Sequence, residues 1–509
     1  MELEVDIGGP HRAVGSHSLA QPGRHRSTAG TQLPAPPPGA QPRAVQNAAG
    51  AGIAGLGQHL EAVALNLHLF IANPISVIGH GCSPSVSGGA IPYRRSVGEH
   101  AEDTPRQAEF RVEVRAWLEA RAPLREDGDG WSTRTSHSDA AAERAHMDRC
   151  RAWQRELYES GWAAIDWPVD HGGQGGERWQ RQIFQQEAAQ FDVTSGFLAA
   201  GIALAGPAIG HFGTAEQKAR HLKPMLRGDV VWCQLFSEPG AGSDLANLAT
   251  RAERDGDEFV VNGQKVWNSS AHLSDWGILL ARTDPDAPKH KGISFFLLDM
   301  ATPGVDPRPI RTINGSAHFN EVFLSDVRIP ADNVVGEVNS GWAVARLVLA
   351  NESTMIGGGM DRADSTANLI ALARRWGTSQ DPMVRQELAQ AYTKEKLLDW
   401  MGRRLQDDVR RGRRPTFDGS VLKVYWSESR RDRGNLGVGM LGGYGVAGDH
   451  ADTGVWANEA LNRFWGSIGG GTDEVHRNNM AERVLGLPPE PRVDKHVSWR
   501  EQVGGTGSG

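Results

Sequence analysis

The 509-residue chain lacks several features that would assign it to a class by composition alone. Its three cysteines, Cys82, Cys150 and Cys233, are too few and too scattered for a disulfide framework or a zinc site. A reducing, cytoplasmic location without a bound metal is therefore expected. No run of about 18 or more apolar residues occurs, so no transmembrane helix and no membrane partner are expected. The net charge of −7 gives no indication of a nucleic-acid partner.

Residues 1–102 have almost no acidic residues after Asp6 and no sustained helical or strand period. They include Pro34-Ala-Pro-Pro-Pro-Gly39 and many glycines, alanines and histidines, a composition typical of disorder. The segment also resembles a transit peptide, because it contains arginine and serine but few acids. A third interpretation is a misannotated extension upstream of a true start at Val97. The segment is therefore predicted to be disordered or misannotated.

Helical periodicity begins at Thr104-Pro-Arg-Gln107, where an N-cap threonine, a proline at the first helical position and a glutamine form a capping box. An N-terminal helical domain is predicted over 103–229. Its further helices are expected at about 140–160, 177–190, 195–212 with a break near Gly206-Pro207, and from Thr214 onward.

A different pattern follows, with short apolar or alternating segments bounded by Gly, Asp and Pro. No helix-length segment separates them, which predicts a mostly antiparallel barrel or sandwich over 230–335. The strands are expected at 230–236, 258–261, 276–281, 293–298 and 322–327.

Long helical periods return over 336–491 and predict a helical bundle, followed by a tail over 492–509. The fold class is therefore α+β, with helices, a β-domain and a four-helix-type bundle in that order. The bundle helices are expected at about 340–355, 364–376, 381–411, 420–434 and 473–484.

Two segments of the β-domain suit a flat, hydrogen-bonding ligand. Phe236-Ser-Glu-Pro-Gly-Ala-Gly-Ser-Asp244 is a loop whose glycines let the backbone approach a ligand closely. Asn262-Gly-Gln-Lys-Val-Trp-Asn-Ser-Ser270 offers Trp267 for stacking, with Ser237 and Ser269 as hydroxyl partners. The alternative is a plain β-hairpin that turns at Asn262-Gly263.

Seven motifs in order make the chain similar to the acyl-CoA dehydrogenase family from about Asp103 to Pro491. A sister flavoenzyme such as an acyl-CoA oxidase is the alternative. The seven motifs are Gly213-Thr-Ala-Glu-Gln-Lys218, Ser237-Glu-Pro-Gly-Ala-Gly-Ser-Asp244, Asn262-Gly-Gln-Lys-Val-Trp267, Phe323-Leu-Ser-Asp-Val-Arg-Ile-Pro330, Gly336-Glu-Val-Asn-Ser-Gly-Trp342, Leu441-Gly-Gly-Tyr-Gly445 and Gly471-Thr-Asp-Glu474.

The resemblance implies an enzyme that binds FAD between the β-domain and the bundle. Such enzymes remove a proton from Cα and a hydride from Cβ of an acyl-CoA thioester and form a trans-2-enoyl-CoA. The expected partners are the acyl-CoA substrate and an electron-transferring flavoprotein. A homotetramer or homodimer is expected, and a hetero-oligomer stays open.

The resemblance also implies the residues that meet FAD. Phe236, Ser237 and Ser243 would line the flavin or its pyrophosphate arm, and Ser243 could also touch CoA. Trp267 would lie against the ring system, with Asn268 beside it and Ser269 near N5. The remaining contacts, to FAD of the same or a neighbouring subunit, would come from Arg374 (or Arg375), Gly442, Gly443, Thr472 and Glu474.

The catalytic base implied by the resemblance is Glu352. Many members carry a Glu directly before Gly-Thr of the last motif, where this chain has Gly470. Isovaleryl- and long-chain-type members carry it about eleven positions after the Gly of Gly341-Trp342, and that position is Glu352. Two departures are Ser353, where the subset has Arg, and Gly439, where the family has Gln. A catalytically weak FAD-binding partner subunit of a hetero-oligomer is therefore a second hypothesis.

Overall fold

The computed structural model describes residues 103–124, 140–193, 196–357, 365–410, 419–447, 451–492 and 494–504. The predicted N-terminal extension, 1–102, lies outside the described residues.

The first helices begin where the sequence predicts them. The Thr104 hydroxyl accepts from the Gln107 backbone N–H, and the Gln107 side chain accepts from the Thr104 N–H, which completes the capping box. The break near Gly206 is a π-helical segment, Ala200–Ala205 (η3), followed directly by α5. The helices of this region are α2 (Pro105–Glu119), α3 (Ala140–Glu159), α4 (Arg178–Ala188), α5 (Gly206–Phe212) and α6 (Ala215–Leu226).

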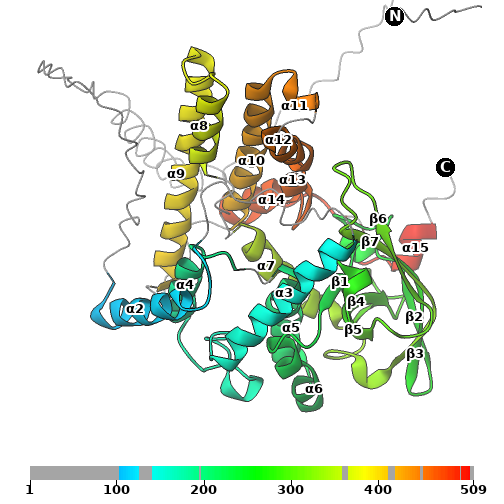
Figure 1. The fold of residues 1–509 in the computed structure, drawn as a ribbon. Helices are drawn as coiled ribbons and strands as arrows, with labels where there is room; N and C mark the ends of the chain where they lie inside the picture. Colours follow the sequence, from blue (N-terminus) through cyan, green and yellow to red (C-terminus); the bar gives the residue numbers. More distant parts are fainter. Residues whose placement is uncertain are drawn as a thin grey trace, which may run out of the picture. The chain divides into compact units, whose positions relative to one another are not determined.

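The middle region is one seven-stranded sheet with the order β1-β4-β2-β3-β7-β6, and β5 pairs with β4 (Figure 1). Most pairs are antiparallel, as predicted, but β4 runs parallel to both β1 and β2. The strands are β1 (Trp232–Leu235), β2 (Arg251–Asp255), β3 (Glu258–Ser269), β4 (Trp276–Arg282), β5 (Ile293–Asp299), β6 (Val305–Ile310) and β7 (Phe319–Pro330).

Two strands were not predicted. β2 is almost entirely charged and exposed, so it has no apolar alternation. β6 contains Pro307 and Pro309, which argue against a strand from sequence, yet it lies at the sheet edge where proline is tolerated.

The hairpin interpretation of Asn262-Gly263 is wrong. Both residues lie inside β3, at a register shift opposite β7. The turn between β2 and β3 is instead at Gly256, whose φ is +61°. A Cβ on Gly263 would lie 2.3 Å from Thr250 Oγ1, so glycine here serves a close approach of two segments.

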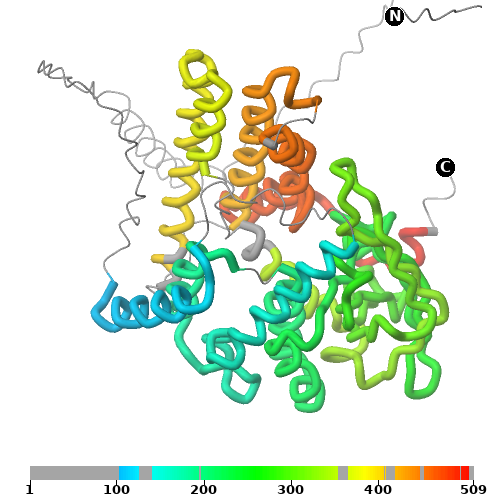
Figure 2. Tube along the Cα trace, viewed as in Figure 1, coloured from blue at the N-terminus to red at the C-terminus, as the bar shows by residue number. Residues whose placement is uncertain are grey.

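The C-terminal helices include a group packed around α10, with Leu369, Leu372, Leu436, Met440 and Trp456 in its core. Figure 2 shows α8, α9 and α10 running side by side. α10 extends seven residues beyond its predicted end, and α12 was not predicted. The helices are α7 (Gly341–Gly357), α8 (Thr366–Arg375), α9 (Pro382–Arg410), α10 (Gly419–Leu441), α11 (Tyr444–Ala447), α12 (Ala451–Asn462), α13 (Trp465–Ile468), α14 (Asp473–Asn479) and α15 (Trp499–Gly504).

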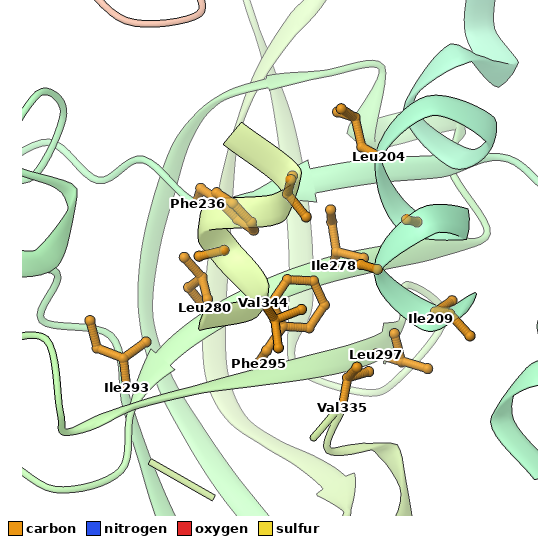
Figure 3. Close-up of a cluster of buried hydrophobic side chains, with 14 of the residues drawn as sticks. Leu204, Ile209, Phe236, Ile278, Leu280, Ile293, Phe295, Leu297, Val335 and Val344 are labelled. Carbon is orange, nitrogen blue, oxygen red and sulfur yellow. The ribbon is translucent and has the colours of Figure 1, made fainter. Parts of the chain in front are cut away.

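Helix α7 is anchored to the sheet through a shared hydrophobic core. Val344 of α7 packs in one cluster with Phe295 of β5 and Ile209 of α5 (Figure 3). A Cβ on Gly341 would lie 2.5 Å from the Phe295 backbone nitrogen, so only glycine lets the helix begin this close to β5. These contacts fix where the later turns of α7 lie relative to β1.

Candidate active site

The α7 helix places the Glu352 carboxyl beside the sheet. Glu352 lies eleven positions after Gly341, about 16 Å along the helix axis. Gln234 of β1 donates its side-chain N–H to Glu352 Oε2 at 3.2 Å. Burial raises the pKa of the Glu352 carboxyl above its usual range, and the Gln234 hydrogen bond lowers it by less. A carboxyl in this environment is a stronger base than an exposed one.

The same strand holds the bulge that carries Trp267. Asn268 donates its side-chain N–H to the Gln234 carbonyl at 2.8 Å. A register shift between Lys265 and Asn268 turns Trp267 into the left-handed region, with φ of +63°. The Trp267 ring is 58% exposed, and Ser269 is exposed beside it. The bulge therefore presents an exposed aromatic ring and a hydroxyl, and Asn268 between them is linked through Gln234 to Glu352.

Two predicted cofactor residues have buried side chains. Asn268 is 2% exposed and donates its side-chain N–H to the Gln234 carbonyl, so it positions the bulge. The Phe236 side chain is 3% exposed and packs against Phe295 in the core. Apolar burial stabilises Phe236 there, so only its backbone is left to face a ligand.

The loop after β1 keeps its glycines open. The backbone N–H and C=O groups of Glu238 and Ala241 pair reciprocally at 3.0 Å and close a turn. A Cβ on Gly240 or Gly242 would meet nothing within 4 Å, and Ser243 is exposed. The loop is joined to β3 because the Ser237 carbonyl accepts from the Val266 N–H at 2.9 Å.

A buried ion pair fixes this loop, and sequence reasoning missed it. Lys265 Nζ lies 2.7 Å from Glu238 Oε1 and donates to the Phe236 carbonyl at 3.0 Å. Burial lowers the pKa of Lys265. For Glu238, burial acts upward, but the Lys265 charge and the N–H donors of Ala249 and Thr250 bring its pKa below its usual value. The ion pair and its hydrogen bonds therefore tie the loop to β3.

The predicted residues on the bundle form a second, exposed group. Arg374 is exposed and has no ion-pair partner among the residues that the structure describes, whereas Arg375 is bound to Asp452 at 2.6 Å. This difference favours Arg374 as the residue available for a ligand. Gly442 has φ of +55°, and neither it nor Gly443 has an atom within 4 Å of an added Cβ.

The last motif caps α14. The Thr472 hydroxyl accepts from the Val475 N–H at 3.2 Å, so its oxygen already has a structural role. Glu474 is exposed in the first turn. Gly470 has φ of +66°, a conformation that disfavours the Glu found there in other members.

The structure thus joins Trp267, Ser269 and the 236–244 loop with Glu352, while Arg374, Gly442 and Gly443 lie on the bundle. Gln234 is the functional candidate that sequence reasoning missed; the signal was a polar side chain inside an otherwise apolar strand. Within the described part of the chain, no three potential metal ligands cluster. No described helix has both the length and the apolar character required to cross a membrane.

Three family models match the chain. The acyl-CoA dehydrogenase N-terminal domain matches residues 104–229, the middle domain 233–327 and the C-terminal domain 339–485.

Individual relatives agree with these matches. The acyl-CoA dehydrogenase IpdE1 of Mycobacterium tuberculosis is 38% identical over 386 residues, which cover 75% of this chain and 98% of the relative. The solved Tcur3481-Tcur3483 steroid ACAD matches with a TM-score of 0.65 at 30% identity and covers 77% of this chain and 100% of its own. The ChsE4-ChsE5 complex from Mycobacterium tuberculosis matches at 0.61 and 30%, with 77% and 100% covered.

The chain belongs to the acyl-CoA dehydrogenase family. It is an oxidoreductase of acyl-CoA lipid catabolism, and FAD is its cofactor. The residues present fit this group. The exposed Trp267 ring offers a face to a flat ring system, and the open backbone at Gly240 and Gly242 leaves room for a close approach.

Proposed function

We propose that Glu352 is the base of an acyl-CoA dehydrogenase reaction and removes the α-proton of the acyl-CoA thioester. The observation that carries this proposal is a carboxyl with a raised pKa, one hydrogen bond from the strand that holds the Trp267 bulge. When bound, FAD supplies the hydride acceptor for Cβ.

The other residues of the site act by position. The Trp267 ring would stack against the flavin, and the Ser269 hydroxyl would offer it a hydrogen bond. Gln234 orients the Glu352 carboxylate through its amide N–H. Arg374, Gly442, Gly443 and Glu474 would contact FAD from the bundle of the same or a neighbouring subunit, and Ser243 would contact FAD or CoA.

A bulky, steroid-derived acyl group is the proposed substrate class. It is supported by the similarity to a structure named as a steroid ACAD. The proposed electron acceptor is an electron-transferring flavoprotein. An acyl-CoA oxidase would instead reduce oxygen directly, so oxygen consumption during turnover separates the two.

The test is anaerobic flavin bleaching of the purified protein with straight-chain, branched and steroid-side-chain acyl-CoAs. Bleaching with any acyl-CoA supports the activity, and the fastest bleaching is expected for the steroid-derived compound. A protein that retains FAD but is bleached by none of them contradicts the proposed function.

A second candidate is a weak or inactive FAD-binding subunit that works with a different chain. It is favoured by Ser353 and Gly439, which depart from the family pattern, and by the similarity to structures named for two proteins. The solution mass of the protein alone separates a homodimer or homotetramer from a chain that needs a partner.

A further inference from the structure

A histidine lies behind the bulge that carries Trp267 and Ser269. His272 belongs to the short 3₁₀ segment Ala271–Leu273 (η5), directly after the bulge, and its side chain is 19% exposed. Its Nδ1 lies 3.0 Å from Asn320 Oδ1, and its Nε2 lies 3.1 Å from Glu143 Oε2. The imidazole thus joins α3 to β7.

The hydrogen bonds decide which atoms donate. Asn320 donates its side-chain N–H groups to the carbonyls of Asn268, at 2.9 Å, and His318, at 3.3 Å. Carbonyl oxygens only accept, so the Asn320 amide is oriented with its oxygen toward His272. The Nδ1 atom of His272 is therefore the donor to Asn320, and Nε2 lies within hydrogen-bond distance of Glu143.

The contact between His272 and Asn320 affects a bulge whose backbone conformation is strained. Trp267 and Ser270 both have positive φ, at +63° and +54°, a region that non-glycine residues rarely occupy. Such a conformation persists only where the surroundings over-determine it. The Asn268 carbonyl lies between these two residues, and Asn320 is the side chain that holds it.

We propose that His272 is a positioning residue, held between Glu143 and Asn320 by hydrogen bonds from its two ring nitrogens. It orients Asn320, and Asn320 fixes the Asn268 carbonyl, so that Trp267 and Ser269 keep the geometry that receives the flavin. The proposal rests on the proposed function, in which these two residues contact FAD.

The test is FAD titration of the apo-protein, followed by quenching of flavin fluorescence. In His272→Phe, both hydrogen bonds are lost, and FAD is expected to bind about tenfold more weakly. His272→Gln can keep only one of the two hydrogen bonds and is expected to weaken binding by about threefold. Glu143→Gln keeps a hydrogen-bonding group beside Nε2 and leaves the Nδ1 donor to Asn320 in place, so a smaller loss is expected. His211→Phe, on the exposed surface of α5, is the matched control and should bind FAD normally.

The proposal predicts the order in which the variants lose FAD affinity. A folded His272→Phe protein with the wild-type FAD affinity and flavin absorption spectrum would overturn it. If His272→Phe does not fold, a Glu143→Gln effect larger than that of His272→Gln overturns it. A wild-type protein that binds FAD but is not bleached by acyl-CoA contradicts the proposed function alone. Normal bleaching in all variants, with unchanged FAD affinity, contradicts the role of His272 alone.

Discussion

The β-sheet part of the candidate site is held by buried contacts within the chain, whereas the bundle part is exposed. Gln234, Asn268 and the Lys265–Glu238 pair fix the bulge and its loop from behind. Arg374 and Gly442, in contrast, face open surroundings. The fold therefore fixes the sheet part of the candidate site through its own contacts, whereas Arg374 and Gly442 are left open to solvent.

The sharpest test of the part of the site beside the sheet is Glu352→Gln. It should retain FAD but lose about 10³-fold in the rate of flavin reduction, because the proposed general base is removed. Stopped-flow bleaching with the best acyl-CoA measures this. A variant that reduces flavin at the wild-type rate would remove Glu352 from the proposed mechanism.

Removing one partner of the buried Lys265–Glu238 ion pair should lower the free energy of unfolding more than any substitution at an exposed position. Lys265→Met leaves the Glu238 carboxylate buried without its counter-charge and should cost about 3–5 kcal/mol in the free energy of unfolding. Urea denaturation measures this. Lys265→Met combined with Glu238→Gln should recover part of the loss; if the double variant is no more stable than the single one, the pair does not hold the loop.

The part of the candidate site on the bundle is tested by substituting two neighbouring arginines. Arg374→Gln should weaken FAD binding by about tenfold, the value of a lost charged hydrogen bond, without changing stability. Arg375→Gln loses an exposed ion pair with Asp452 and should cost at most about 1 kcal/mol of stability, with unchanged FAD affinity. The opposite result would assign the FAD contact to Arg375.

The pH dependence of flavin reduction reports on Glu352 directly. The base must be ionised, so the rate should rise with pH through the raised pKa and level off above it. Gln234→Leu removes the hydrogen bond that favours the carboxylate, so the midpoint should move to higher pH. A midpoint that stays in place would show that Gln234 does not act on Glu352.

The raised pKa of Glu352 also makes the stability of the folded protein depend on pH. The contribution to stability falls as pH rises, whereas the rate of flavin reduction rises. A carboxyl whose pKa is raised by folding stabilises the protein at low pH, and this contribution is lost as pH rises through the raised pKa. Glu352→Gln should therefore be more stable than wild type above that pKa, and the difference should shrink as pH falls. Thermal unfolding across the pH range measures the trend.

The smallest effect is expected from placing a Glu at position 470, where many members of the family carry the base. Gly470→Glu in the Glu352→Gln background should not restore bleaching, because a φ of +66° disfavours a residue with a side chain. Recovery of even one tenth of the wild-type rate would show that this loop adapts.

Much of the fold could be read from local patterns. The Thr104 capping box and the long helical periods depend on neighbours in the chain, so their positions agree with the structure. β2 and β6 were missed because their own residues give no strand signal: β2 is almost entirely charged, and β6 contains two prolines. Both become ordered by pairing with a neighbouring strand, and α12 becomes ordered by packing into the core around α10. The burial of the Phe236 and Asn268 side chains could not be predicted either, because the order of motifs along the chain does not show which way a side chain points.

The sequence by itself determined the family, the cofactor and the position of Glu352, because these follow from ordered motifs along the chain. Only the tertiary structure decided which groups surround that carboxyl. Gln234, which donates to Glu352, is 118 residues away from it in sequence. The contact behind the Trp267 bulge likewise joins Glu143 and His272, which are 129 residues apart. Burial and hydrogen bonding over such separations arise only when helices and sheet pack together.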